Sequence, residues 1–213
     1  MAADIKEVLI PDNKVSRILT RVCYMAVLNI VWLCTSVLLV TIGPSTVALY
    51  IVIEKMRSNT EQGIVRTYFN AFKVEFKNGM FLSLTFWLFF GVLFLDMYLL
   101  HKAPGSFNSV MYGGCITLLV FGVAMFVYVF ELAAIFENTI KGYFLAAFKL
   151  VVCNLPLSVL VICVNVCIPL LFFFLPGVIS KFAALILIFG GSSVAYVSSY
   201  LLGGVMEGLK AKS

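Results

Sequence analysis

Long stretches without any charged residue dominate this chain and limit what it can fold into. No residue from Cys23 to Gly43 or from Leu150 to Val178 is charged, and each stretch reaches the ~20 residues that an α-helix needs to cross ~30 Å of hydrocarbon. Because 62% of the residues are hydrophobic and only 12% are charged, a soluble core of this size cannot hide the apolar surface. The chain is predicted to be an integral membrane protein. Runs suited to spanning helices are 22–42, 79–100, 109–131, 150–174 and 182–204.

The N-terminal region lacks the pattern of a cleaved signal peptide. Residues 1–14 are polar and of mixed charge, whereas a signal peptide begins with a positive segment before a short apolar one. The first apolar run is also long enough for a full span. We expect this run to be retained as a membrane anchor.

The shorter apolar stretch from Ser45 to Ile53 decides how often the chain crosses. If residues 44–56 return to the starting side, 13 of the 15 lysines and arginines lie on one side of the membrane, and only Lys102 and Lys181 lie on the other. If they do not return, the split becomes 6 against 9. Since basic residues concentrate on the cytoplasmic side, six passes with both termini in the cytoplasm are predicted. The expected fold is an all-α six-helix transmembrane bundle of three up-down hairpins, with a short second helix and cytoplasmic amphipathic interfacial helices.

A weak internal repeat organises the same chain. Shifting the sequence by 76 positions pairs Lys73 with Lys149 and Glu131 with Glu207. The alternative is chance similarity, because membrane hairpins draw on few residue types, and both interpretations stay open. We expect a single transmembrane domain of residues 1–213, which consists of the hairpins 1–57, 58–132 and 133–213.

The segment that joins the first two hairpins is strongly amphipathic. From Ile64 to Phe76, apolar residues recur at helical spacing opposite a basic polar face. Such a face suits anionic headgroups, so this helix and its shorter counterpart from Thr139 to Lys149 are expected along the inner membrane surface. They serve either as interfacial anchors or as a docking surface for a cytoplasmic partner. The candidate interface consists of Arg66, Tyr68, Phe69, Phe72, Lys73 and Lys149.

Four acidic residues lie in or near the apolar runs, where a charge is a candidate functional group by default. They are Asp96, Glu54, Glu131 and Glu207. Asp96 lies near the outer end of its expected helix, so either ion binding or contact with the outer interface explains it. The three glutamates lie toward the cytoplasmic ends of their helices, and a ring of them is a candidate inner mouth or partner site. The structural alternative is a set of salt bridges to Arg66, Lys73 or Lys149 that hold the amphipathic helices to the hairpins.

The last apolar run carries small residues at intervals of four. They are Gly191, Ala195, Ser199 and Gly203. Such a stripe lets another helix backbone approach closely, and that helix belongs either to this chain or to a second subunit. In the preceding run, Pro156 and Pro169 should bend the helix, because proline leaves a backbone carbonyl unpaired.

No motif for catalysis or cofactor binding is present in the sequence. It lacks a Gly-x-Ser-x-Gly elbow, a phosphate-binding loop and a His-Glu-x-x-His pair. A single histidine, His101, and six cysteines show no metal-ligand spacing. We therefore expect no enzyme activity, no cofactor and no metal. The basic excess follows the inner-face bias, so we expect no nucleic-acid binding.

Three segments of the N-terminal third are similar to a known family: Leu28–Leu33, Thr41–Tyr50 and Tyr68–Lys73. On these segments the chain resembles the YesL family of small bacterial membrane proteins, although Pro44 stands where a small residue such as alanine is expected. The resemblance implies a location in the bacterial plasma membrane. It implies no activity and no active-site residues, since the family has none agreed. Its members tend to be encoded beside carbohydrate importers and polysaccharide-degrading enzymes.

Two functions follow as expectations. The first is a non-enzymatic accessory or scaffold component of a bacterial carbohydrate ABC importer, with the lipid bilayer and importer permease or other membrane protein subunits as partners. The second is a small transporter or channel that acts alone, with Asp96, Asn29 and Asn165 along a polar path. Short outer loops and few intramembrane charges favour the first.

Overall fold

The computed structural model describes residues 14–58, 60, 63–102, 106–167 and 176–210. Helices account for nearly all of these residues, and no strand occurs among them. In chain order they are α2 (Lys14–Thr35), α3 (Ile42–Arg57), α4 (Ile64–Val74), α5 (Phe76–Lys102), α6 (Ser106–Ile135), α7 (Ile140–Cys153), α8 (Leu155–Ile162), the π-helix η1 (Cys163–Cys167) and α10 (Pro176–Lys210). The expectation of an all-helical chain is confirmed.

Among the described residues, two helices are long and apolar enough to cross a membrane. They are α5 and residues Asn108–Ile135 of α6. A third candidate consists of Ile140–Cys153 and Leu155–Val166, which qualify together but are bent by 104° where they meet. Helix length and apolar composition thus support a membrane location for the described chain. The complete set of six passes stays a prediction.

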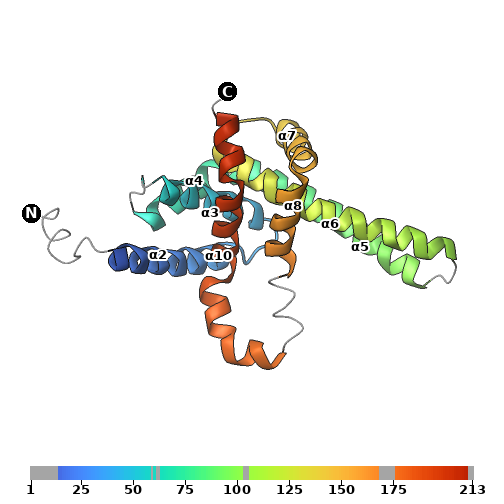
Figure 1. Ribbon diagram of the computed structural model, residues 1–213, viewed down its shortest axis with the longest axis horizontal. Coiled ribbons are helices and arrows are strands. Elements are labelled where there is room, and N and C mark those ends of the chain that lie inside the picture. Colours follow the sequence, from blue (N-terminus) through green and yellow to red (C-terminus); the bar gives the residue numbers. More distant parts are fainter. Residues whose placement is uncertain (1–13, 59, 61–62, 103–105, 168–175, 211–213) are drawn as a thin grey trace, which may run out of the picture.

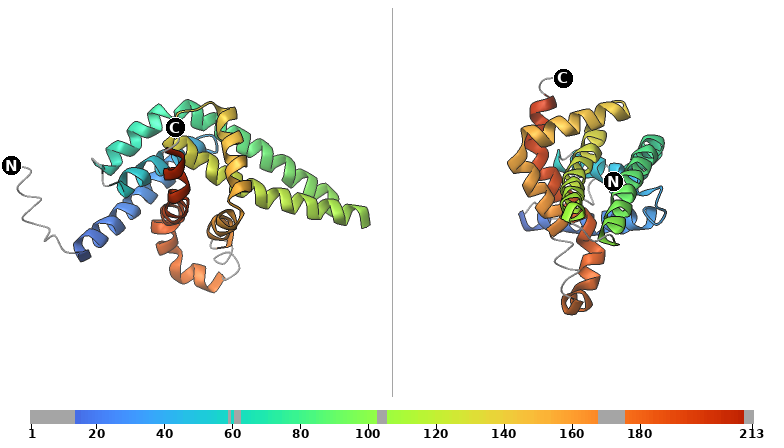
Figure 2. Two further views of the ribbon diagram at one scale, coloured as in Figure 1. Left: turned by 45° about the horizontal axis from the view of Figure 1, so that its top comes forward. Right: turned by 90° about the vertical axis from the view of Figure 1, so that its right-hand side faces the viewer.

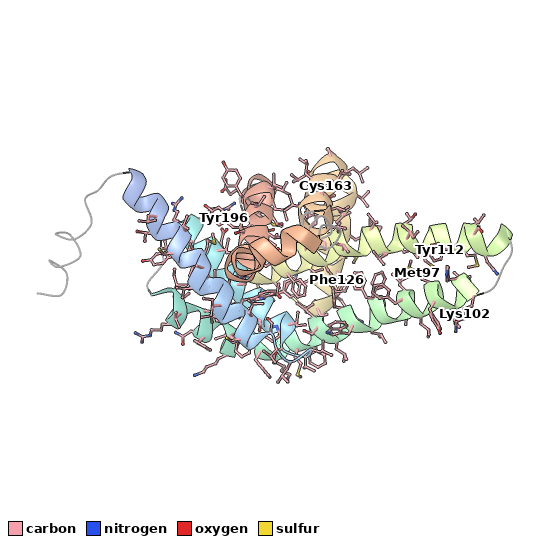
Figure 3. The ribbon with its side chains drawn as sticks, turned by 90° about the horizontal axis from the view of Figure 1, so that it is seen from below. Met97, Lys102, Tyr112, Phe126, Cys163 and Tyr196 are labelled. Atoms are coloured by element: carbon pink, nitrogen blue, oxygen red, sulfur yellow. The ribbon has the colours of Figure 1, made fainter. Side chains whose placement is uncertain are left out.

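Helices α5 and α6 form a hairpin that projects from the rest of the molecule along its long axis (Figures 1 and 2). At the base of the hairpin, the rings of Phe86 and Phe126 meet edge to face at 5.1 Å, and Phe90 lies 4.6 Å from Phe86. Figure 3 places Phe126 at this base and Met97 and Tyr112 toward the far end. Aromatic pairs of this kind stabilise the packing of two helices beyond the area that they bury.

Helix α3 is the most enclosed of the described helices. It contacts α2, α4, α5, α6 and α10, and Val47, Ala48 and Leu49 are each at most 2% exposed. Three consecutive buried positions mean that protein covers the helix on every side. Because lipid does not surround it, its 16 residues need not match the thickness of a bilayer. The short second helix is thus found inside the protein.

The turn between α2 and α3 lies against the base of the α5–α6 hairpin. The backbone N–H of Gly43 donates to the Ser83 hydroxyl, and the Tyr68 hydroxyl lies 2.6 Å from Thr35 Oγ1. Gly43 permits this approach, because a Cβ atom there would collide with the carbonyl oxygen of Gly79. The expected arrangement placed this turn across the membrane from the segment that holds Tyr68. The structure instead packs the first hairpin across the base of the second, so three parallel hairpins are not confirmed.

The expected fifth span, 150–174, is broken in the structure. Helix α7 ends at Cys153 and α8 begins at Leu155, so the expected interfacial segment and the start of the expected span share one helix. Pro156 accounts for the break, because proline lacks the N–H that would continue α7 but is tolerated in the first turn of a new helix, where it lies in α8. Pro169 lies outside the described residues.

Candidate functional site

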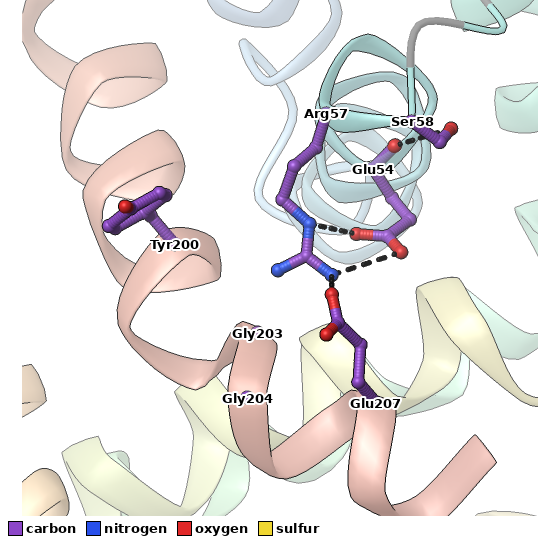
Figure 4. A pocket seen from close by; sticks show the side chains of 7 residues that line it. All are labelled: Glu54, Arg57, Ser58, Tyr200, Gly203, Gly204 and Glu207. Atoms are coloured by element: carbon purple, nitrogen blue, oxygen red, sulfur yellow. Dashed lines mark hydrogen bonds and ion pairs between the residues drawn. The ribbon is translucent and has the colours of Figure 1, made fainter. Parts of the chain in front are cut away.

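The guanidinium group of Arg57 joins the end of α3 to α10 (Figure 4). Within α3, its Nε lies 3.2 Å from Glu54 Oε2 and its Nη2 lies 3.4 Å from Glu54 Oε1. The same Nη2 donates to Glu207 Oε1 at 3.2 Å, and Nη1 donates to the Ser199 carbonyl oxygen at 3.3 Å. One cation therefore serves two carboxylates and one backbone acceptor on two helices.

A cleft of about 570 Å³ opens beside these ion pairs. It is lined by Glu54, Arg57, Ser58, Tyr200, Gly203, Gly204 and Glu207 (Figure 4). Gly203 makes room for the guanidinium group, because a Cβ atom at this position would collide with Arg57 Nη1. Two carboxylates against one guanidinium give the ionised cleft a net negative charge.

Glu131 of α6 is almost completely buried, with 1% of its surface exposed. Among the described residues, no hydrogen bond of ordinary geometry reaches either carboxyl oxygen, although the Ser199 side chain interacts favourably with the carboxyl group. Arg57 and Glu54 are charged groups within its electrostatic reach. The structure thus brings Glu54, Glu131 and Glu207 together around Arg57, from three different helices.

The cation at the centre of this cluster is not one of those expected. The expected cations are exposed: Arg66, Lys73 and Lys149. Arg57 follows Glu54 by three residues, a spacing at which helical side chains meet, so this pair could have been found from the sequence. The part played by Glu207 could not, because 150 positions separate it from Arg57.

The small-residue stripe of α10 packs inside this chain. At Gly191, an added Cβ atom would lie 2.7 Å from the ring of Trp32 on α2. Between Gly191 and Gly203, Ala195 and Ser199 are 5% and 2% exposed. The neighbours of the stripe are therefore α2 and α3, and it requires no second subunit.

Two asparagines that interrupt apolar segments also bind α10. Asn29 Oδ1 accepts a hydrogen bond from the backbone N–H of Ser192 at 2.8 Å, and Asn165 Nδ2 donates to Ser198 Oγ at 2.8 Å. Asp96, by contrast, is exposed on the C-terminal half of α5. The polar path expected along these three residues stays a prediction.

The candidate interface on α4 and α7 lies only partly at the surface. Its exposed members are Arg66, Phe69, Lys73 and Lys149, and Phe72 is partly buried. Tyr68 is fully buried, and its hydroxyl donates to the Ser45 carbonyl oxygen at 3.3 Å as well as contacting Thr35. Burial raises the pKa of the Tyr68 phenol. Tyr68 is therefore a packing residue that a partner cannot reach, which corrects its assignment to the interface.

Comparison with known proteins covers one part of the chain. Residues 25–97 match the model of a family described as "Protein of unknown function, DUF624", and this segment is about a third of the 213 residues. It contains Glu54 and Arg57 but not Glu131 or Glu207. No curated protein and no solved structure matches the chain. The resemblance to the YesL family stays a prediction, and over residues 25–97 the chain is similar to a family of uncharacterised proteins.

Proposed function

We propose that this protein is a non-enzymatic accessory or scaffold subunit of a carbohydrate ABC importer in the bacterial plasma membrane. The class of partner rests on the resemblance to the YesL family. The structural feature that supports a partner is the projecting α5–α6 hairpin, because its outer surface suits another membrane helix.

This hairpin leaves a long apolar surface uncovered by the rest of the chain. Of the 18-residue apolar stretch in α5, 22% is buried inside the protein, whereas 56% of the corresponding stretch in α6 is buried. Leu88, Phe94 and Leu95 are 57–68% exposed. Lipid tails cover such side chains as readily as protein does, so apolar exposure alone does not require a partner.

Open glycines on the same hairpin favour a partner helix over lipid. Gly91 of α5 and Gly113 and Gly114 of α6 have no neighbouring atom within 4 Å of an added Cβ. In a membrane, helices associate through close packing, and small residues let their backbones approach. Because no described helix of this chain fills these positions, we assign them to a helix of the importer permease.

We place the base of the hairpin at the cytoplasmic face and its far end outside. The exposed Lys73 and Lys77 lie at the base, and a bias of basic residues toward the cytoplasm supports this orientation. The exposed Arg66 and Phe69 of α4 then face lipid headgroups. Across the whole chain, the basic residues favour cytoplasmic termini and a first hairpin that returns to the cytoplasmic side.

Co-purification from gently solubilised native membranes tests this function. We expect permease subunits to be recovered with the native chain and lost with Gly91→Leu or Gly113→Leu, because a leucine at these positions keeps a second helix at a distance. Gly208→Leu in α10 is the matched control, since its surroundings are equally open, and it should retain the partner.

Recovery of the native chain alone would contradict the proposal, as would undiminished recovery with both hairpin variants. Solute flux into liposomes that contain only this protein would instead support the second function, a transporter or channel that acts alone.

A further inference from the structure

Glu131 holds a carboxyl group deep inside the protein. Its side chain is 1% exposed, and no hydrogen bond of ordinary geometry reaches either carboxyl oxygen from the described residues. A charged carboxylate without direct partners is strongly unfavourable in a protein interior. The group therefore needs either a cation or a proton.

The neighbouring cation is already shared. Arg57 contacts Glu54 and Glu207 and donates to the Ser199 carbonyl oxygen. If all three glutamates were ionised, three negative charges would surround one positive charge. Water stabilises Glu207, whose side chain is 70% exposed. The Glu131 carboxyl group has no such access to water, so a negative charge there would be the least stabilised of the three.

A metal ion does not fit this position better than a proton. Within the described ranges, no group of three or more His, Cys, Asp or Glu side chains is arranged to hold a metal. Glu131 is not among the residues that line the cleft beside Arg57. A proton requires no cavity.

The groups around Glu131 suit proton binding. Those within its electrostatic or hydrogen-bonding reach are Tyr50, Glu54 and Arg57 of α3, Tyr128 of α6 itself and Ser199 of α10. No charged group of the described parts of α5, α7 and α8 acts on it. Hydroxyl groups both donate and accept hydrogen bonds, so they can serve either protonation state.

A polar connection extends from Glu131 in two directions. Toward the cleft lies Arg57 with its ion pairs. In the other direction, the Tyr50 hydroxyl lies within reach of the Ser198 side chain, whose Oγ accepts a hydrogen bond from Asn165 Nδ2. Asn165 lies in η1, and single π-helical turns are rare distortions often found at functional sites.

We propose that Glu131 is a proton-binding site that exchanges its proton with water. In binding, a hydronium ion gives up a proton to a carboxylate oxygen of Glu131 and becomes water, and release is the reverse. This site does not depend on the importer partner, so either proposal can fail without the other.

Infrared spectroscopy of the full chain in lipid nanodiscs tests the site during a pH titration. We expect a carbonyl band of a protonated carboxylic acid that is absent in Glu131→Gln and retained in the control Asp96→Asn, because Asp96 is exposed on α5 and lies outside this cluster. In heavy water the band should shift, because a deuteron from water replaces the bound proton. Gel filtration checks that each variant is folded.

A band that persists in Glu131→Gln overturns the proposal, as does its absence from the native chain at every pH at which the protein stays folded. A band that does not shift in heavy water contradicts exchange of the proton with water. If Glu131→Gln does not fold, Glu131→Asp replaces it, since the shorter acid should move the band to a new frequency and an unmoved band overturns the assignment.

Discussion

The Arg57 guanidinium lies 3.2 Å from the Glu207 carboxylate, a contact that joins residues 150 positions apart. It ties the end of α3 to the C-terminal part of α10. Glu54 shares the same cation, and Glu131 lies within its electrostatic reach. Arg57 is thus the common counter-charge for the carboxylates of α3 and α10.

Replacing Arg57 should destabilise the protein far more than replacing its exposed partner. We expect Arg57→Gln to lower the free energy of unfolding by about 3 kcal/mol, because loss of one member of a largely buried ion pair leaves the other charges uncompensated. Glu207→Gln should cost at most about 1 kcal/mol, since exposed ion pairs contribute little. Reversible unfolding in detergent measures both values. Equal losses would mean that Arg57 does not organise the cluster.

Replacing each of two adjacent glycines of the cleft by alanine should change the stability of the protein in opposite directions. At Gly203, the new Cβ atom collides with Arg57 Nη1, and moving the guanidinium away sacrifices hydrogen bonds at about 1 kcal/mol. At Gly204, no atom of another part of the chain lies within 4 Å of an added Cβ. Alanine there should therefore stabilise the helix by about 0.5–1 kcal/mol. Thermal unfolding of Gly203→Ala and Gly204→Ala compares them. Stabilisation by both would show that Arg57 is free to move.

Tyr68→Phe should weaken the contact between α4 and the α2–α3 turn. The lost hydrogen bonds of the hydroxyl should cost about 1 kcal/mol near neutral pH. Because burial raises the pKa of Tyr68, the stabilisation is complete below the unfolded pKa of ~10 and is lost as the pH rises above it. Melting curves at neutral and alkaline pH should therefore converge for the native chain and Tyr68→Phe. A constant difference between them would argue against this role.

The α2–α3 turn should lie in lipid rather than in water. Val37, Leu38, Leu39 and Val40 are 53–77% exposed, and four exposed apolar residues in succession are unfavourable in water. In a chain without the native cysteines, Leu38→Cys should react with a lipid-soluble thiol reagent and resist impermeant reagents on either side. Reaction from outside would restore the outer turn of the six-pass arrangement.

Arg66→Cys provides the reference for this labelling experiment. It should react with impermeant reagents only from the cytoplasmic side, because α4 lies at the base of the α5–α6 hairpin. Reaction from the outer medium would contradict the cytoplasmic placement of that base.

Features encoded locally were predictable from the sequence. The runs 79–100 and 109–131 lie within α5 and α6, because a span is recognised from the hydropathy of consecutive residues. The amphipathic segment after the first hairpin forms α4. The convergence of the three glutamates also follows from their similar places near the ends of returning helices.

Contacts between distant surfaces were not predictable in the same way. The close approach of Gly43 to Gly79 depends on how two helices cross, and hydropathy carries no information about crossing. The burial of Tyr68 has the same origin, since helical spacing distinguishes an apolar face but not the part of that face which contacts protein. The contact of Arg57 with α10 could not be predicted either, because it depends on the space that Gly203 leaves for the guanidinium group.

The enclosure of α3 has a consequence for biosynthesis. This helix is made before α10, yet α10 is one of the walls around it. Until α10 is made, the side of α3 that carries Arg57 lacks its neighbour. The native surroundings of α3 can therefore form only after α10 has been synthesised.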